Sequence, residues 1–197
     1  MKKVLLLSLT LLLCASVAFS QFGIKAGINL ATAGGADKGD LKGKVGFAAG
    51  VSSKMGLIAG LSIQPEILYI QKGAMWENPF HKTTFNLTYI DIPVLVKFNL
   101  PVPVLSPYIE GGLSYGILLS AKEKTEFTAL AGSLPTEEVN IKDGMTKGDL
   151  SILVGIGVEL AIIDINARYI IGMTKLYKDS DAKIFNRGIL LTAGLRL

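Results

Sequence analysis

The chain has 197 residues, with 20 basic side chains, 16 acidic side chains and one histidine. This length suits a single domain, and the formal charge of +4, which is not gathered into a basic stripe, argues against nucleic-acid binding. Half of the residues are hydrophobic, yet no run after the leader reaches the roughly 20 apolar residues that a membrane-spanning helix needs.

Residues 1–20 are predicted to be a cleaved signal peptide. Two lysines precede an apolar run over residues 4–13, and Ala18 and Ser20 supply the small residues of a cleavage site before Gln21. The protein is therefore expected to be exported.

The single cysteine, Cys14, lies within this leader. It raises the alternative of a lipoprotein, but Leu13 stands where a lipidation signal normally needs a small residue. The mature domain, residues 21–197, contains no cysteine, which excludes disulfides and thiolate metal sites. Its fold is expected to depend on packing and backbone pairing.

Alternating side chains organise the rest of the chain. The segment over residues 149–173 is very apolar, yet it contains Glu159, Asp164 and Arg168. With a period of two, its aliphatic residues fall on one face and its small or charged residues on the other, as in a β-strand. The same alternation predicts eight strands. They cover residues 22–30, 45–52, 61–67, 90–99, 109–117, 151–160, 163–172 and 188–197.

Two prolines, Pro65 and Pro93, interrupt this pattern. Proline lacks the N–H that a strand ladder needs, and it prefers edges or bulges. We therefore expect a local bulge at each of these two positions.

The side-chain composition of the two strand faces predicts which face points into the barrel and which points outward. Glycine, alanine and a few charged side chains fit inside a narrow eight-stranded barrel, where the charges can pair. The bulky aliphatic face then points outward, and in water it would form an apolar band far larger than a soluble monomer exposes. The sequence therefore predicts an all-β fold, an eight-stranded antiparallel up-and-down transmembrane β-barrel of the bacterial outer membrane, surrounded by lipid.

The links between the strands alternate in length, as the short periplasmic turns and long outer loops of outer-membrane barrels do. Long links are expected at about residues 31–44, 71–85, 120–148 and 173–186, and shorter ones at 53–56, 100–106 and 161–162. The segment over residues 121–148 is too polar for the bilayer. It is expected either to be mobile or to extend a hairpin above the membrane.

Five aromatic residues fall near the predicted strand ends on the lipid-facing side. They are Phe22, Tyr69, Phe98, Tyr115 and Tyr169. Aromatic side chains gather at both membrane interfaces of such barrels, so these residues are interpreted as girdles. The alternative is that they belong to the core of a soluble β-sandwich.

The motif "GLSYG" at residues 112–116 matches the G-x-S-x-G pattern of hydrolases and nominates Ser114 as a nucleophile. That pattern has mechanical meaning on a strand-to-helix turn with a histidine later in the chain. The sequence around Ser114 is strand-like, and the only histidine, His81, precedes it in a predicted loop. We therefore expect a small lumen-facing serine and no enzyme activity.

The mature domain has no cysteine and one histidine, so a metal site there would depend on carboxylates. Glu137, Glu138 and Asp143 lie in one predicted loop, but they lack the ligand spacing of a calcium loop. They are interpreted as a solvated acidic patch, and neither a metal nor a cofactor is expected.

Charged residues on the inward face form the most informative group. Four cations and five anions are expected to line the lumen: Lys25, Glu66, Asp91, Lys97, Glu110, Glu159, Asp164, Arg168 and Arg196. Charges in so narrow a space are stable when they are paired and hydrogen-bonded. The sequence therefore predicts a salt-bridged lumen without a wide pore, and a proton or small-ion path remains the alternative.

Several stretches together resemble a known family. "LSIQPEILYIQKGA", "LTYIDIPVLVKFNL", "PYIEGGLSYG", "INARYIIGMT" and "GILLTAGLRL" are similar to the PorT-like outer-membrane β-barrel family of Bacteroidota, over most of residues 21–197. The resemblance implies an eight-stranded barrel that is inserted by the β-barrel assembly machinery of Gram-negative bacteria, and it brings no catalytic site. Such barrels usually end in an aromatic residue, whereas this chain ends in Leu197.

Three functions remain open at this point. The leading hypothesis is a non-enzymatic, porin-like outer-membrane protein that binds a protein partner through residues 121–148, because binding commonly uses loops on a rigid frame. The second is a narrow channel for ions or small solutes. The third is an accessory component of a protein secretion system.

Overall fold

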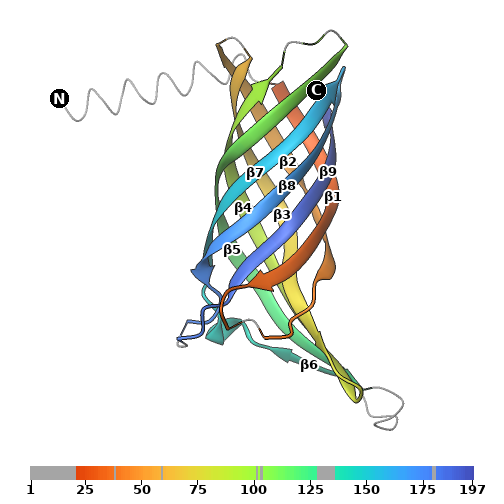
Figure 1. Cartoon of the computed structure of the whole chain (residues 1–197), viewed down its shortest axis with the longest axis vertical. Coiled ribbons are helices and arrows are strands. Elements are labelled where there is room, and N and C mark those ends of the chain that lie inside the picture. Colours follow the sequence, from red (N-terminus) through yellow and green to blue (C-terminus); the bar gives the residue numbers. More distant parts are fainter. Residues whose placement is uncertain are drawn as a thin grey trace, which may run out of the picture.

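A ring of antiparallel strands forms the body of the protein (Figure 1). The computed structural model describes residues 21–37, 39–58, 60–100, 102, 104–127, 136–178 and 181–197; the predicted signal peptide lies outside them. The strands are β1 (Gln21–Gly34), β2 (Lys44–Ile58), β3 (Leu61–Glu77), β4 (His81–Asn99), β5 (Leu105–Phe127), β6 (Glu137–Asn140), β7 (Gly148–Leu160), β8 (Ile163–Lys175) and β9 (Phe185–Arg196).

Eight of these strands close the barrel. Neighbours in the order β4-β3-β2-β1-β9-β8-β7-β5 are hydrogen-bonded, and β4 also pairs with β5, which completes the ring. The short strand β6 lies outside the ring and, within the described part of the chain, pairs with the far end of β5 alone. The predicted eight-stranded up-and-down fold is confirmed.

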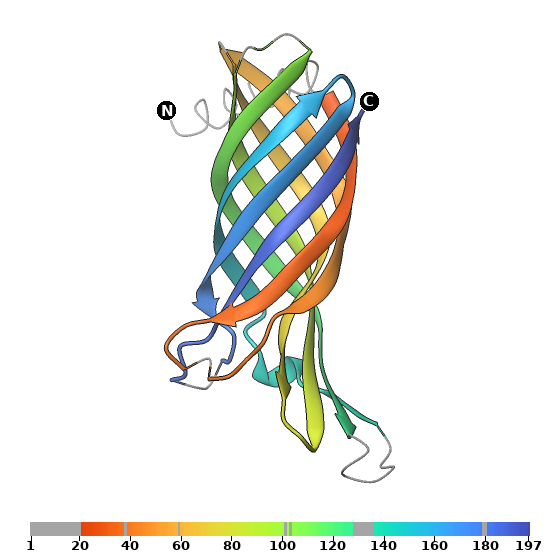
Figure 2. The same cartoon turned by 45° about the vertical axis from the view of Figure 1, so that its right-hand side comes forward.

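The two ends of the barrel differ. The short links from β2 to β3, β4 to β5 and β7 to β8 lie together with the chain terminus Leu197 at one end, which we call the turn end (Figure 1). The other four links lie at the opposite end, which we call the loop end. There β3, β4 and β5 run beyond the ring and, with β6, form a protruding sheet (Figure 2).

Strand boundaries differ most from the predictions where strands continue into segments expected to be links. β2 runs through residues 53–56 to Ile58, and the expected link at 71–85 shrinks to Asn78–Phe80. The side chain of Asn78 explains this tight turn, because its Oδ1 accepts hydrogen bonds from the backbone N–H groups of Phe80 at 2.9 Å and His81 at 2.8 Å. Part of residues 121–148 extends a hairpin, with Lys122–Thr125 paired to Glu137–Asn140.

The bulges predicted at the two prolines are wrong. The register of β3 on β4 is unchanged across them, with Pro65 opposite Val94 and Leu68 opposite Asp91. Each proline removes one ladder donor, and this loss needs no inserted residue. The irregularity in β4 lies instead against β5, between Thr88 and Tyr89.

Bulky apolar side chains cover the outside of the barrel. On β7, Val154 and Ile156 are exposed while Ser151 and Leu153, on the opposite side, are buried. All five aromatic residues of the predicted girdles point outward and are exposed. Among the described residues, no helix is long and apolar enough to cross a membrane.

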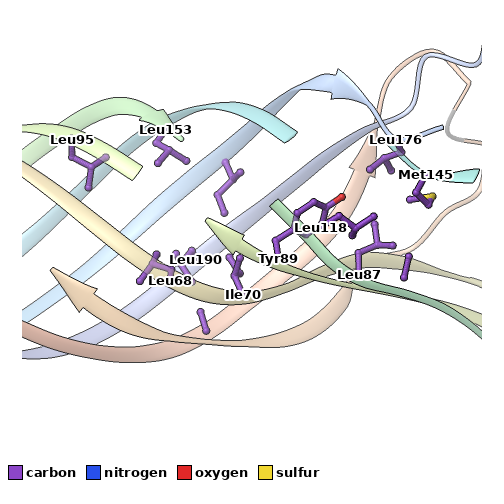
Figure 3. Close-up of a cluster of buried hydrophobic side chains, with 13 residues drawn as sticks. Leu68, Ile70, Leu87, Tyr89, Leu95, Leu118, Met145, Leu153, Leu176 and Leu190 are labelled. Carbon is purple, nitrogen blue, oxygen red and sulfur yellow. The ribbon is translucent and has the colours of Figure 1, made fainter. Parts of the chain in front are cut away.

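The lumen also holds an aliphatic layer that the sequence analysis did not anticipate. Its side chains are buried and come from five strands: Leu68, Ile70, Leu95, Leu153, Ile170 and Leu190 (Figure 3). On several strands this layer separates two charged positions. β3 carries Glu66, then Leu68 and Ile70, then Lys72; β4 carries Lys97, Leu95 and Asp91; and β7 carries Glu159, Leu153 and Asp149.

Candidate functional site: the charged lumen and the loop end

The nine charged residues predicted for the lumen all lie on its inner wall. Eight are buried, and Arg196, at the turn end, is partly buried. The structure adds Lys54, Lys72 and Asp149, which also point inward. All three had fallen in or at the edge of segments interpreted as links, although they continue the inward alternation of β2, β3 and β7. With them, the described residues place six cations and six anions in the lumen.

Arg168 on β8 is the centre of the first group. Its Nη1 donates to Glu66 Oε2 at 2.9 Å, and its Nε donates to Glu110 Oε1 at 2.8 Å. Lys25 donates to the other oxygen of Glu66 at 2.7 Å. The planar guanidinium can bond two carboxylates at once, which a lysine ammonium does not do in the same fixed geometry. This group joins strands β1, β3, β5 and β8 across the lumen.

Lys97 and Asp164 form a second group nearer the turn end. Their side chains are 2.9 Å apart, and the Lys97 ammonium lies 3.7 Å from the centre of the Tyr108 ring. The hydroxyl of Tyr108 donates to Asp164 at 2.8 Å. Each partner therefore has a charged contact and a second polar or aromatic contact, as stable burial requires.

Glu159 on β7 receives several cations at the turn end. Lys54 lies 2.8 Å from its carboxylate, Arg196 lies 2.7 Å away and Lys97 lies 3.4 Å away. Arg196 also donates to the backbone carbonyl of Ala161 in the β7–β8 turn. The charges at this end of the lumen therefore fasten strands β2, β4, β7 and β9 together.

Lys72 forms a third group on the other side of the aliphatic layer. Its ammonium lies 2.8 Å from Asp91 and 2.9 Å from Asp149, and Asn186 donates to Asp149 at 2.9 Å. Gly116 faces Asp91 on one neighbouring strand and Asp149 on the other. A Cβ at Gly116 would lie 2.5 Å from Asp91 Oδ1, so this position leaves room for the pair of carboxylates.

Apolar side chains from the loops pack over the loop end of the lumen. Met145 and Leu176 are buried there against Leu87 and Leu118 of the barrel wall (Figure 3). Their backbone is fixed by hydrogen bonds such as that from Thr146 N–H to Leu176 O at 2.8 Å. These residues place an apolar cluster between the Lys72 group and the protruding sheet.

Ser114 and His81 are far apart in the structure. Ser114 is buried on the lumen wall opposite Pro93 of β4, whereas His81 begins β4 at the loop end, twelve residues earlier (93 − 81 = 12). At about 3.3 Å per residue, this separation is about 40 Å along the strand. The pair therefore cannot act as a nucleophile and its base.

The three acidic residues weighed as calcium ligands lie in different environments. Glu137 and Glu138 are on β6, and Asp143 lies in a short 3-10 turn over Lys142–Gly144. Glu138 pairs with Lys122 at 2.6 Å, and this hydrogen bond lowers the pKa of the Glu138 carboxyl below its ordinary value. Within the part of the chain that the structure describes, no three histidine, cysteine or acidic side chains are grouped so that they could hold a metal ion.

Comparison with solved structures shows which known folds the barrel is similar to. Neisserial surface protein A is similar over 89% of this chain and 96% of its own, with 17% identity and a TM-score of 0.51. The outer membrane protein OprG from Pseudomonas aeruginosa covers 90% of this chain and 96% of its own, with 8% identity and a TM-score of 0.49. At such identities the likeness concerns the fold alone. That fold, an antiparallel up-and-down ring of eight strands, is the one that Neisserial surface protein A has.

Sequence comparison names the family. Residues 15–178 match the model of the outer membrane protein beta-barrel domain. The chain belongs to this family and is an integral outer-membrane β-barrel protein. No curated protein matches the sequence.

Proposed function

We propose that this protein is a non-enzymatic outer-membrane barrel whose lumen is closed and whose loop end makes its specific interactions. The observation that carries the closed lumen is its layering: ion pairs, an aliphatic layer, a second set of ion pairs and an apolar cluster follow one another. A file of water or ions would have to pass the aliphatic side chains of both apolar layers, beside which lie only buried polar atoms such as Asn29 Oδ1 and Ser114 Oγ among the described residues. The leading alternative is a narrow channel.

Conductance in planar lipid bilayers tests the closed lumen. We expect the protein to give no stable unitary current steps. A matched variant, Leu153→Ser combined with Ile170→Ser, places hydroxyls in the aliphatic layer without touching a charged residue, and it reports whether that layer is the barrier. Large, stable steps from the unaltered protein would show that the lumen conducts and would contradict the proposal.

The proposed orientation places the loop end outside the cell and the turn end in the periplasm. The long links and the protruding sheet are at the loop end, and outer-membrane barrels carry their longer loops outside. The five outward aromatic residues serve as membrane-interface girdles in this orientation. We further propose that residues 1–20 are a cleaved signal peptide, that the β-barrel assembly machinery inserts the domain, and that it is a PorT-like protein of Bacteroidota.

The loop end is proposed to bind a protein partner through the tip of its sheet. Deleting all of residues 121–148 would also remove Ala121 and Met145, which pack in the apolar cluster. A sharper variant deletes residues 123–139 and joins Lys122 to Asn140, which already face each other across the β5–β6 pair, through an Asn-Gly turn.

Pulldown from outer membranes solubilised in detergent tests this role. The deletion variant should keep the heat-modifiable migration of a folded barrel and lose a partner that the unaltered protein retains. A co-purifying component of a secretion system would identify the protein as an accessory of that system. Retention of every partner by the deletion variant would contradict a role for the tip.

A further inference from the structure

A recess of about 500 Å³ lies at the loop end, outside the charged lumen. It is formed by the protruding parts of β3, β4 and β5 together with the β1–β2 and β8–β9 links. The side chains around it that carry the argument are Trp76, His81, Phe85, Tyr177, Asp40 and Glu123. This composition, four aromatic rings and two carboxylates, differs from that of the lumen and of the lipid-facing wall.

The aromatic residues gather on one face of the protruding sheet. Trp76 and His81 meet edge to face with ring centres 5.0 Å apart, and Phe127 lies 6.3 Å beyond His81. The opposite face instead carries exposed ion pairs, Lys122 with Glu138 and Lys124 with Glu126, each at 2.6 Å. On one face of this sheet, charged side chains therefore pair with one another. The other face directs aromatic rings into the recess.

The recess has an excess of negative charge. Asp40 and Glu123 are the only charged residues among the described residues that line it, and no ion pair involves either one in that part of the chain. Lys42, close to Asp40 in the sequence, is engaged by Glu77 at 3.2 Å. Burial and the nearby Glu123 carboxylate raise the pKa of Tyr177, so its ring stays neutral at physiological pH.

Rings and carboxylates in one recess favour a cationic ligand. The faces of tryptophan and tyrosine attract ammonium groups, most strongly when the cation leaves water, and quaternary ammonium ligands are recognised by such aromatic walls. The carboxylates add attraction for a cation and repel phosphate or sulfate groups. A neutral sugar could stack on the rings, but it would leave the negative charge of the recess without a counter-charge.

We propose that the recess at the loop end is a binding site for an organic cation of the alkylammonium class. The proposal deepens the suggested role of the loop end in external interactions and rests on it in one respect, that this end faces the outside of the cell. The occupant is a group with a positive nitrogen and an apolar surface, such as a quaternary ammonium headgroup.

Trp76 is the only tryptophan of the protein, so its fluorescence reports directly on the recess. The experiment titrates the full-length protein with choline in maltoside micelles, because zwitterionic detergents with choline headgroups would compete. The matched probe is the neutral isostere of choline in which carbon replaces the quaternary nitrogen, and sodium chloride keeps the ionic strength constant. We expect a saturable change of Trp76 emission with choline and at least about tenfold weaker binding of the isostere.

Two variants test whether choline binding depends on the charge of Glu123 and not on a change in folding. Glu123→Gln should weaken choline binding by about fivefold, because it removes one of the two carboxylates near a largely solvated site. Glu126→Gln is the matched control: it makes the same change on the same strand, three residues further on and on the opposite face. It should leave choline binding unchanged, and heat-modifiable migration verifies that both variants are folded.

Three outcomes would overturn the proposal. Equal binding of choline and its isostere would mean that the recess is only an apolar hollow. Equal weakening of choline binding by the two variants would mean a general charge effect. A change in Trp76 emission that does not saturate would mean that there is no site. None of these results bears on conductance or on the pulldown with the deletion variant, so failure here is distinguishable from failure of the proposed function.

Discussion

The protein contains ion pairs in two different surroundings, the lumen and the protruding sheet. In the lumen, the side chains of Arg168 and Glu66 are 1% and 0% exposed, whereas those of Lys122 and Glu138 in the sheet are 52% and 49% exposed. The contact distances are similar, at 2.9 Å and 2.6 Å. Distance alone therefore does not tell how much an ion pair matters to this fold.

Solvent accounts for the difference. Removing one partner of an ion pair in the lumen leaves a buried charge on the other partner. Neither water nor another protein group can fully stabilise that charge. Losing one partner in the sheet leaves a charge that water solvates at once, and surface pairs accordingly add little to stability. The comparison predicts a steep decline in mutational effect from the centre of the lumen to the tip of the sheet.

The largest effect is expected for Arg168→Met. Methionine is apolar and leaves Glu66 and Glu110 without their shared guanidinium, so the free energy of unfolding should fall by about 3–5 kcal/mol. Urea-induced unfolding from lipid vesicles, followed by tryptophan fluorescence and heat-modifiable migration, measures this change.

Arg168→Lys is the informative control for that variant. It retains the positive charge but loses the fork that contacts both carboxylates, so it should recover part of the lost stability and not all of it. Full stability of Arg168→Met would show that the lumen is hydrated enough to solvate its carboxylates, and the contrast between the two regions would then fail.

An intermediate effect is expected for Gly116→Ala. The new Cβ would lie 2.5 Å from Asp91 Oδ1 and would push this carboxylate away from Lys72, so we expect a loss of about 1–3 kcal/mol. Gly111→Ala, on the same strand, is the matched control, because its Cβ would meet its nearest neighbour, Leu153 O, at an ordinary 3.7 Å. Similar unfolding curves for the two variants would argue against a crowded Asp91 site.

The alternation of side chains predicted most of this arrangement. A period of two places Arg168 and Glu66 on the inner face whatever the rest of the chain does, because successive side chains in a strand point to opposite sides. It also predicted the ring and its outward apolar surface. The alternation does not show where a strand stops, and for this reason Lys54, Lys72 and Asp149 were hidden in segments interpreted as links.

Contacts between distant strands were beyond the sequence. In the sequence, Leu153 and Ile170 are simply two apolar residues on the face that otherwise carries small or charged side chains. The aliphatic layer forms only when β3, β4, β7, β8 and β9 are brought together. The recess with Trp76 and Tyr177 likewise depends on β3 and β4 continuing as a hairpin beyond the ring. The signal for that hairpin was present in Asn78 and Pro79, a pair typical of tight turns.

The smallest effect is expected in the sheet, for Lys122→Met. The hydrogen bond from Lys122, followed by its charge, holds the pKa of Glu138 below its ordinary value, so removing Lys122 should raise that pKa. Because the carboxyl's folded-state pKa is depressed, any stability from this pair is present above the ordinary carboxyl range and is lost as the pH falls through the folded-state pKa. At neutral pH the unfolding curve of the barrel should not move measurably.

Carbon-13 NMR of the labelled Glu138 carboxyl in micelles measures this pKa, and urea unfolding of the same variant measures stability. The matched control is Lys82→Met, which removes a lysine of the same sheet that forms no ion pair with Glu138 and should leave its pKa unchanged. A clear loss of stability in Lys122→Met at neutral pH would mean that the sheet supports the ring. The two regions would then differ in solvent exposure without differing in their importance for the fold.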